Sequence, residues 1–223
     1  MSKGSRQEVP LASGEFALRT ADALPHAGLG EDTLVERCRR GEPEAFARLV
    51  ALHERMVFNL AARLLNDAEE ARDLGQDVFL QVYKTIERFE GRSSLRTWIY
   101  RIVVNQCRNR RRWWRRRRRE AWTPIENLTA SDEADMAARQ GGEDAVERVA
   151  RRERAARVQR ALEGLSFDHR AVLLLREVEG LSCEEIGQAL GLPEGTVKSR
   201  LSRARDGLRV QMEKMAPELR AAR

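Results

Sequence analysis

The stretch that decides the fold runs from Gly180 to Leu208 and reads GLSCEEIGQALGLPEGTVKSRLSRARDGL. Ser182 and Glu185 stand three residues apart, the pattern of a capping box at the start of a short helix, and Gly191 stands where that helix would end. A second helix is predicted to begin near Glu194. Apolar residues recur every three or four positions along it, at Val197, Leu201, Ala204 and Leu208. The stretch therefore predicts two short helices joined by a tight turn.

The other face of the second predicted helix is polar and basic. It carries Lys198, Ser199, Arg200, Ser202, Arg203 and Arg205. A solvated surface helix would also be charged, but here the capping box, the stop glycine, the short turn and the basic face coincide. This combination favours a helix-turn-helix whose second helix enters the major groove of DNA.

The composition of the whole chain points to an anionic partner and to small domains. The 223 residues carry a net charge of +6, which indicates nucleic acid or an anionic lipid surface. Hydrophobic residues make up 42%, which is low for one large core and favours two small helical cores.

The composition also argues against several classes of protein. The three cysteines lie far apart without a CxxC pattern, so we expect neither a disulfide framework nor a bound metal, and no cofactor. Apolar runs fall short of the roughly 18 residues of a membrane span, and no signal peptide is evident, so we expect no membrane insertion and a cytoplasmic protein.

Helical periodicity begins at Glu31, after a leader at 1–30 that we predict to be disordered. One short helix should end at Gly41 and a long helix should start at Pro43. Asp67 can cap a third helix. That helix leaves Asp73, Gln76 and Asp77 on one exposed face, which spacing alone would explain as a solvated surface.

A further helix should follow the turn-forming residues 89–94, with Ser93 or Ser94 as its cap. Its outward side is basic, and it runs into RNRRRWWRRRRRE at 108–120. Such a density of guanidinium groups predicts contact with the phosphates of a polyanion. Trp113 and Trp114 could stack on bases or lie covered by neighbouring arginine side chains, and the pattern leaves both open.

The charge reverses after this helix. Acidic residues dominate about 121–149, and Pro124 and the Gly141–Gly142 pair interrupt any helix, which indicates a flexible acidic linker. Periodicity resumes at 149–162 and 167–178, and no stretch alternates as a strand would. We therefore predict an all-α fold: two small helical domains at 31–119 and 149–215, a linker at 120–148 and a tail at 216–223.

Two segments in fixed order add a resemblance to a known family. They are DAEEARDLGQDVFLQVYKTIERFEGRSSLRTWIYRIVVNQCRNRRR at 67–112 and LEGLSFDHRAVLLLREVEGLSCEEIGQALGLPEGTVKSRLSRAR at 162–205. Together they resemble a bacterial RNA polymerase sigma factor of the sigma-70 family, extracytoplasmic-function group, over about 31–208. Such factors retain two domains, regions 2 and 4, which would be the two predicted domains.

The resemblance implies an alternative sigma factor, not an enzyme. It would bind RNA polymerase core, direct it to specific promoters and help melt the −10 element. The implied partners are the clamp coiled coil of the largest polymerase subunit, the flap of the second-largest subunit, promoter DNA and an anti-sigma factor. The linker would thread the RNA exit path.

The resemblance also implies site residues. Asp73, Gln76 and Asp77 match the D-L-x-Q-D/E pattern that docks on the clamp. The loop at 91–95 resembles the pocket for a flipped −10 base. The implied −10 contacts are Arg92, Ser93, Ser94, Leu95, Trp98, Arg101, Asn105, Arg108 and Arg112. The implied −35 contacts are Thr196, Lys198, Ser199, Arg200, Ser202 and Arg203. Gly75, the leader and the run Arg115–Arg119 depart from the family pattern.

Two other classes of protein compete with this interpretation. A stand-alone repressor or activator would bind duplex DNA by itself, but it would leave the D-L-x-Q-D pattern unexplained. An arginine-rich RNA-binding protein would rest on 108–119 alone and would bind structured RNA without the second domain.

Overall fold

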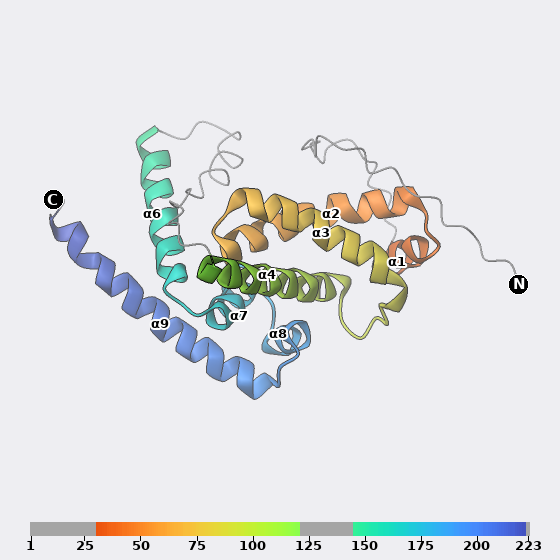
Figure 1. Cartoon of the computed structure of the whole chain (residues 1–223). Coiled ribbons are helices and arrows are strands. Elements are labelled where there is room, and N and C mark those ends of the chain that lie inside the picture. Colours follow the sequence, from red (N-terminus) through yellow and green to blue (C-terminus); the bar gives the residue numbers. More distant parts are fainter. Residues whose placement is uncertain (1–29, 121–144, 222–223) are drawn as a thin grey trace, which may run out of the picture. The chain divides into compact units, whose positions relative to one another are not determined.

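The computed structural model describes residues 30–120 and 145–221, and within them every regular element is a helix (Figure 1). The predicted leader and most of the predicted linker lie outside these residues. The elements are α1 (Glu31–Arg39), α2 (Pro43–Leu65), α3 (Ala68–Thr85), the 3₁₀ turn η2 (Ile86–Arg88), α4 (Leu95–Glu120), α6 (Ala145–Glu163), α7 (Phe167–Glu177), α8 (Cys183–Leu190) and α9 (Glu194–Ala221). The all-α prediction is confirmed.

The helix boundaries differ from the predicted ones at two places. Helix α6 begins at Ala145, four residues inside the predicted linker, and α9 continues to Ala221, through most of the predicted tail. The extension of α6 at 145–148 reads AVER, in which Ala, Glu and Arg are strong helix formers, whereas α9 continues through Pro217.

The contacts divide the chain into a first unit, residues 1–52, and a second unit, residues 53–223. In the first unit, α1 buries Leu34, Val35 and Cys38 and is followed by Gly41 in the left-handed conformation, with φ of 77°. A side chain is strained at that φ, so glycine suits the turn before α2.

The second unit begins within α2 and contains the remaining elements. In it, α3 packs along α4, and their buried faces are apolar (Figure 1). Asp67 caps α3 by accepting a hydrogen bond from the Glu70 N–H at 3.0 Å, as predicted. Of the two candidate caps of α4, Ser94 is the one observed: its hydroxyl oxygen accepts from the Thr97 N–H at 3.1 Å.

Helices α6 to α9 pack on one another in the second unit, where α9 contacts α6, α7 and α8. A buried arginine, Arg170 of α7, lies 3% exposed and donates to three backbone carbonyls: Leu162 at 2.9 Å, Glu163 at 3.0 Å and Leu64 at 3.2 Å. Burial lowers its pKa to about 10. Those carbonyls lie in the last turns of α6 and α2, where a helix leaves carbonyls without intrahelical partners, so the guanidinium supplies hydrogen bonds at both helix ends; the Leu162 carbonyl also accepts from the Leu165 N–H at 3.0 Å.

The contacts do not separate at the predicted linker. Within the second unit, α4 of the predicted first domain packs against α8 of the predicted second domain. The domain bounds read from the sequence therefore stay a prediction. Within the described residues, no helix is both long and apolar enough to cross a membrane.

Candidate nucleic-acid and protein interfaces

The helix-turn-helix forms as the sequence predicts. The Ser182 hydroxyl accepts from the Glu185 N–H at 3.1 Å, and the Glu185 carboxylate accepts from the Ser182 N–H at 2.8 Å. Hydrogen bonding of Ser182, chiefly its backbone N–H, to the Glu185 carboxylate lowers the pKa of that carboxylate. Gly191 ends α8 with φ of 66°, and the apolar faces of α8 and α9 are buried against each other. This packing leaves the other face of α9 exposed.

The exposed face of α9 carries the predicted −35 residues. Lys198, Ser199, Ser202 and Arg203 are exposed, whereas Thr196 and Arg200 are half-buried. The Lys198 ammonium lies 2.7 Å from the Glu194 carboxylate, which raises its pKa. The Ser199 hydroxyl donates to the Thr196 carbonyl at 3.0 Å, so its remaining capacity is as an acceptor.

The predicted polymerase-binding residues share one exposed face of α3. Asp73, Gln76 and Asp77 are all exposed. Asp77 also accepts a hydrogen bond at 2.9 Å from Arg110 of α4, which donates at 2.9 Å to Glu70 as well. Arg110 therefore connects α4 to this face, a contact that the sequence spacing does not reveal.

The predicted −10 residues before and at the start of α4 are in different environments. Arg92 is exposed and pairs with Glu90 at 2.6 Å, and Ser93 is half-buried. Ser94 is committed to the cap. Leu95 is fully buried, so in this structure its side chain belongs to the core instead of a surface that DNA could reach. Trp98 is half-buried, with its ring 5.3 Å from that of Phe89.

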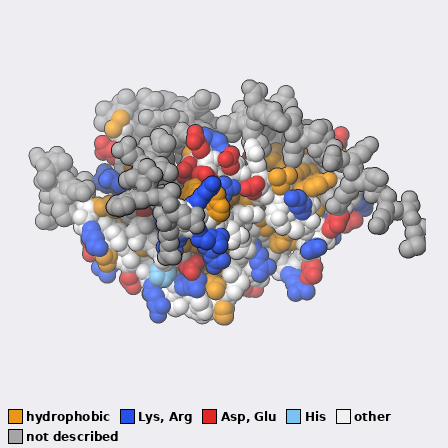
Figure 2. All heavy atoms as spheres, viewed as in Figure 1, with side chains coloured by type: hydrophobic (Ala, Val, Ile, Leu, Met, Phe, Trp, Pro, Cys, Tyr) orange, Lys and Arg blue, Asp and Glu red, His pale blue; other side chains and the backbone are white. Residues whose placement is uncertain are grey.

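The predicted −10 residues further along α4 lie on a polar surface. Arg101, Asn105 and Arg112 are exposed, and Arg108 is half-buried. Arg108 donates to the Asn105 side chain at 3.4 Å. Figure 2 shows basic side chains intermixed with acidic ones on one face of the molecule.

The arginine run after this surface is exposed at 115–117. The guanidinium of Arg117 lies over the Trp113 ring, 4.5 Å from its centroid. Of the two possibilities left open for the tryptophans, this contact supports coverage of Trp113 by an arginine. Trp114 is half-buried.

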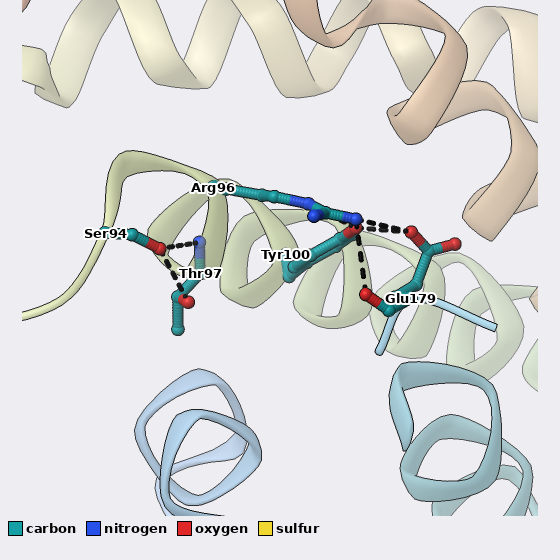
Figure 3. A network of polar contacts seen from close by, with 5 residues as sticks. All are labelled: Ser94, Arg96, Thr97, Tyr100 and Glu179. Atoms are coloured by element: carbon teal, nitrogen blue, oxygen red, sulfur yellow. Dashed lines mark hydrogen bonds and ion pairs between the residues drawn. The ribbon is translucent and has the colours of Figure 1, made fainter. Parts of the chain in front are cut away.

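Two acidic residues that the motifs do not single out bind α4. Glu179 lies in the connection between α7 and α8, and its carboxylate accepts a hydrogen bond from the buried Tyr100 hydroxyl of α4 (Figure 3). Arg96 donates to the same carboxylate at 3.4 Å and to the Tyr100 oxygen at 3.0 Å. Burial and the hydrogen bond to Glu179 raise the pKa of Tyr100. Only the structure reveals this contact, because its members lie about 80 positions apart.

The second of these acidic residues is Asp168, in the first turn of α7. Its carboxylate lies 3.2 Å from Arg108 of α4 and 3.7 Å from Arg200 of α9. No cluster of three or more His, Cys, Asp or Glu side chains suited to a metal ion occurs in the described part of the chain. Glu179 and Asp168 thus each form an ion pair with an arginine of α4.

Comparison with known proteins agrees with this architecture. The profile of sigma-70 region 2 matches residues 49–120, and that of sigma-70 region 4 matches 155–208. Two solved structures have a similar fold. The sigma factor RpoE, in complex with the anti-sigma factor NepR from Bartonella quintana, has a TM-score of 0.59 at 24% identity, covering 76% of this chain and 98% of that one. CnrH, in complex with the cytosolic domain of CnrY, has a TM-score of 0.57 at 23% identity, covering 82% and 97%.

Sequence relatives are similar over most of their length. The RNA polymerase sigma-H factor of Pseudomonas aeruginosa is 35% identical over 185 residues, which cover 80% of this chain and 91% of the relative. The ECF RNA polymerase sigma-E factor of Escherichia coli K12 is 32% identical, covering 81% and 93%. SigW of Bacillus subtilis is 30% identical, covering 80% and 94%. The chain belongs to the sigma-70 family of RNA polymerase sigma factors, extracytoplasmic-function group.

Proposed function

We propose that this chain acts as an alternative sigma factor that brings RNA polymerase core to a specific set of promoters and helps open the DNA at the −10 element. The observation that carries this is one chain holding both an acidic face on α3 beside a basic α4 and, later, a helix-turn-helix with a polar outer face. A generic DNA-binding protein would need only the second part.

For polymerase binding, we assign the exposed α3 face that contains Asp73, Gln76 and Asp77. Two carboxylates and an amide on a rigid helix offer acceptors to a basic partner surface, here the clamp coiled coil of the largest subunit. The flap of the second-largest subunit is the proposed partner of the second domain.

For promoter recognition, we assign separate tasks to the two DNA-facing surfaces. The outer face of α9 would read the −35 element as intact duplex in the major groove. The loop at 91–95 and the start of α4 would receive a −10 base taken out of the stack, which costs a few kcal/mol and is repaid by a fitting pocket. The exposed arginines of α4 would hold the neighbouring phosphates.

The remaining assignments follow from this role. The chain would work in the cytoplasm, where polymerase and promoters are, and as a specificity factor instead of an enzyme. Anti-sigma factors are partners of solved structures with a similar fold, as NepR is of RpoE. We propose that an anti-sigma factor also binds and restrains this chain.

The experiment is in vitro transcription with purified polymerase core and a library of −35 variants. Wild type should give promoter-specific transcripts only in the presence of core, whereas a stand-alone repressor would bind duplex without it. Arg203→Ala should lose about 1 to 3 kcal/mol at the preferred −35 sequence and flatten the ranking of variants, because an arginine can donate two hydrogen bonds to guanine.

Arg209→Ala is the matched control, since Arg209 is an exposed arginine of the same helix that pairs with Glu213 at 3.2 Å. It should leave the ranking unchanged. If Arg203→Ala lowered transcription from all −35 variants equally, Arg203 would contact phosphates and not bases. If no library member were transcribed with core, the proposed function itself would fail.

A further inference from the structure

An arginine of α4 binds two carboxylates of α3 at once. Arg110 donates from Nη1 to Oε2 of Glu70 at 2.9 Å and from Nη2 to Oδ2 of Asp77 at 2.9 Å. Glu70 and Asp77 are two helical turns apart in α3, so both carboxylates lie on the side of that helix that faces Arg110. The planar guanidinium can bind both because its nitrogens donate in fixed, different directions.

The three side chains differ in their exposure to solvent. Arg110 is 27% exposed and Glu70 is 26% exposed, whereas Asp77 is 51% exposed. Burial raises the pKa of Glu70, and the charge of Arg110 opposes this rise by favouring the ionised carboxylate. Arg110 and Glu70 therefore form the inner part of the group, and Asp77 is its outer end, on the face that we assigned to polymerase.

The contact with Arg110 fixes one oxygen of Asp77 and leaves the other for a partner. Oδ2 accepts the hydrogen bond from Arg110, whereas Oδ1 accepts none from the described residues. An aspartate on a surface without such a contact would rotate between staggered conformations and would lose that freedom on binding. Because Arg110 removes this freedom beforehand, Asp77 presents Oδ1 from a fixed position.

The charges of the group also suit a basic partner. One guanidinium meets two carboxylates, so Glu70, Arg110 and Asp77 together stay negatively charged when both acids are ionised. An arginine paired with Asp77 alone would cancel the charge that the partner is meant to meet. Glu70 compensates the positive charge of Arg110 and so leaves the charge of Asp77 available to a basic surface.

We propose that Arg110 is a positioning residue for RNA polymerase binding, which holds the Asp77 carboxylate in the direction that meets the basic partner surface. This role rests on the proposed function, since it concerns how the assigned face of α3 binds core. Arg110 acts through Asp77 and needs no contact with polymerase of its own. The polymerase-binding motif thus depends on a residue that lies 33 positions after Asp77 in the sequence.

The test measures the affinity of the full-length chain for purified RNA polymerase core by fluorescence anisotropy. Arg110→Gln removes the charge and the fork, and it should weaken core binding about three- to tenfold. Arg110→Lys keeps the charge without the fork, so it should recover part of this loss. The control Arg40→Gln removes an arginine that pairs with Glu36 at 3.6 Å, away from α3, and should leave the affinity unchanged.

Double variants distinguish the positioning of Asp77 from a general loosening of the contact between α3 and α4. If Arg110 acts through Asp77, Arg110→Gln should weaken binding little further once Asp77→Asn is present. Gln76 is neutral and is not one of the side chains that Arg110 binds, so Arg110→Gln should keep its full effect beside Gln76→Ala. A loosened contact would instead weaken binding by the same factor in both backgrounds.

Urea unfolding checks that each variant is folded. If Arg110→Gln does not fold, Glu70→Gln takes its place: it leaves Arg110 with Asp77 alone, so the pair becomes neutral and core binding should again weaken. Core affinity of Arg110→Gln equal to or above that of wild type, or equal effects in the two double variants, would overturn the positioning role and leave the proposed function standing. Failure of wild type to bind core would refute both.

Discussion

Replacing Gly75 with alanine should stabilise this protein, although Gly75 departs from the family pattern within the proposed polymerase-binding helix. Gly75 lies inside α3, where glycine costs about 1 kcal/mol relative to alanine because it has more backbone freedom to lose. The structure has room for the methyl group, since an added Cβ would lie 4.0 Å from Cγ1 of Val57, an ordinary van der Waals distance. The full propensity gain should therefore be realised.

The matched control is Gly187→Ala in α8. The helix propensity gain is the same in kind, but the added Cβ would lie 2.7 Å from the backbone carbonyl oxygen of Leu192. That oxygen belongs to the turn between α8 and α9 and cannot move without shifting the helix-turn-helix. The overpacking cost of about 1 to 3 kcal/mol should exceed the gain, so this variant should be destabilised.

Urea unfolding followed by circular dichroism distinguishes the two variants. With a slope of about 2 kcal/mol per molar urea, Gly75→Ala should raise the midpoint by about 0.5 M, and Gly187→Ala should lower it. Polymerase binding by Gly75→Ala should be unchanged, because the added methyl group points toward Val57 and not toward the exposed face. If Gly75→Ala lowered the urea midpoint, or if both variants raised it, the room around an added Cβ would not decide the stability of these variants.

Two further predictions concern side chains that form hydrogen bonds to the backbone in the structure. Arg170→Lys should lower the free energy of unfolding by about 1 to 3 kcal/mol in the same urea assay, because an ammonium cannot reproduce the planar fork that binds the carbonyls of Leu64, Leu162 and Glu163; an unchanged midpoint would show that these carbonyls find other partners. Glu185→Gln should cost up to about 1 kcal/mol near neutral pH, and the difference from wild type should shrink as the pH falls from about 5 to 3. The pKa of Glu185 is lowered in the folded state by its hydrogen bonds to Ser182, so that stabilisation is present above the unfolded pKa and is lost on protonation; melting temperatures across this pH range test it, and a pH-independent difference would contradict it.

The local features of this fold could be predicted because each depends on residues that are close in sequence. The capping box needs only Ser182 and Glu185, and the end of α8 needs only Gly191. The apolar spacing of α9 similarly places Val197, Leu201 and Ala204 inside and leaves the −35 residues outside. Helical periodicity and end signals are sufficient for such elements.

The exact ends of helices and the contacts of single side chains were harder to predict from the sequence. Between Ser93 and Ser94 the pattern could not choose, because either side chain can cap a helix that begins one residue later. Leu95 was assigned to DNA by resemblance, but as the first residue of α4 its side chain is completely buried. A match to a motif places a residue in an element without placing its side chain.

Contacts between distant elements could not be predicted at all. In the sequence, Glu179 is simply an acidic residue that follows an apolar helix. Asp168 is an acidic residue in the first turn of a helix, where the helix dipole alone would explain its presence. Neither residue carries a local sign of its partners on α4. Arg170 is the clearest case, because an arginine in a helix is expected at the surface, and only the carbonyls of two other helices explain its burial.

Arginine suits α4 for a physical reason if its side chains bind carboxylates within the protein and, in the proposed function, phosphates of DNA. Arg96, Arg108 and Arg110 each donate to a carboxylate in this structure, and a carboxylate and a phosphate present similar pairs of acceptor oxygens to the guanidinium fork. An arginine that leaves Asp168 for DNA replaces one charge-assisted hydrogen bond with another, so it need not stay buried without a partner at either end of the exchange. A lysine could supply the charge but not the two-pronged geometry. The carboxylate contacts therefore explain the choice of arginine at positions 96, 108 and 110, and the same three side chains could also bind phosphates.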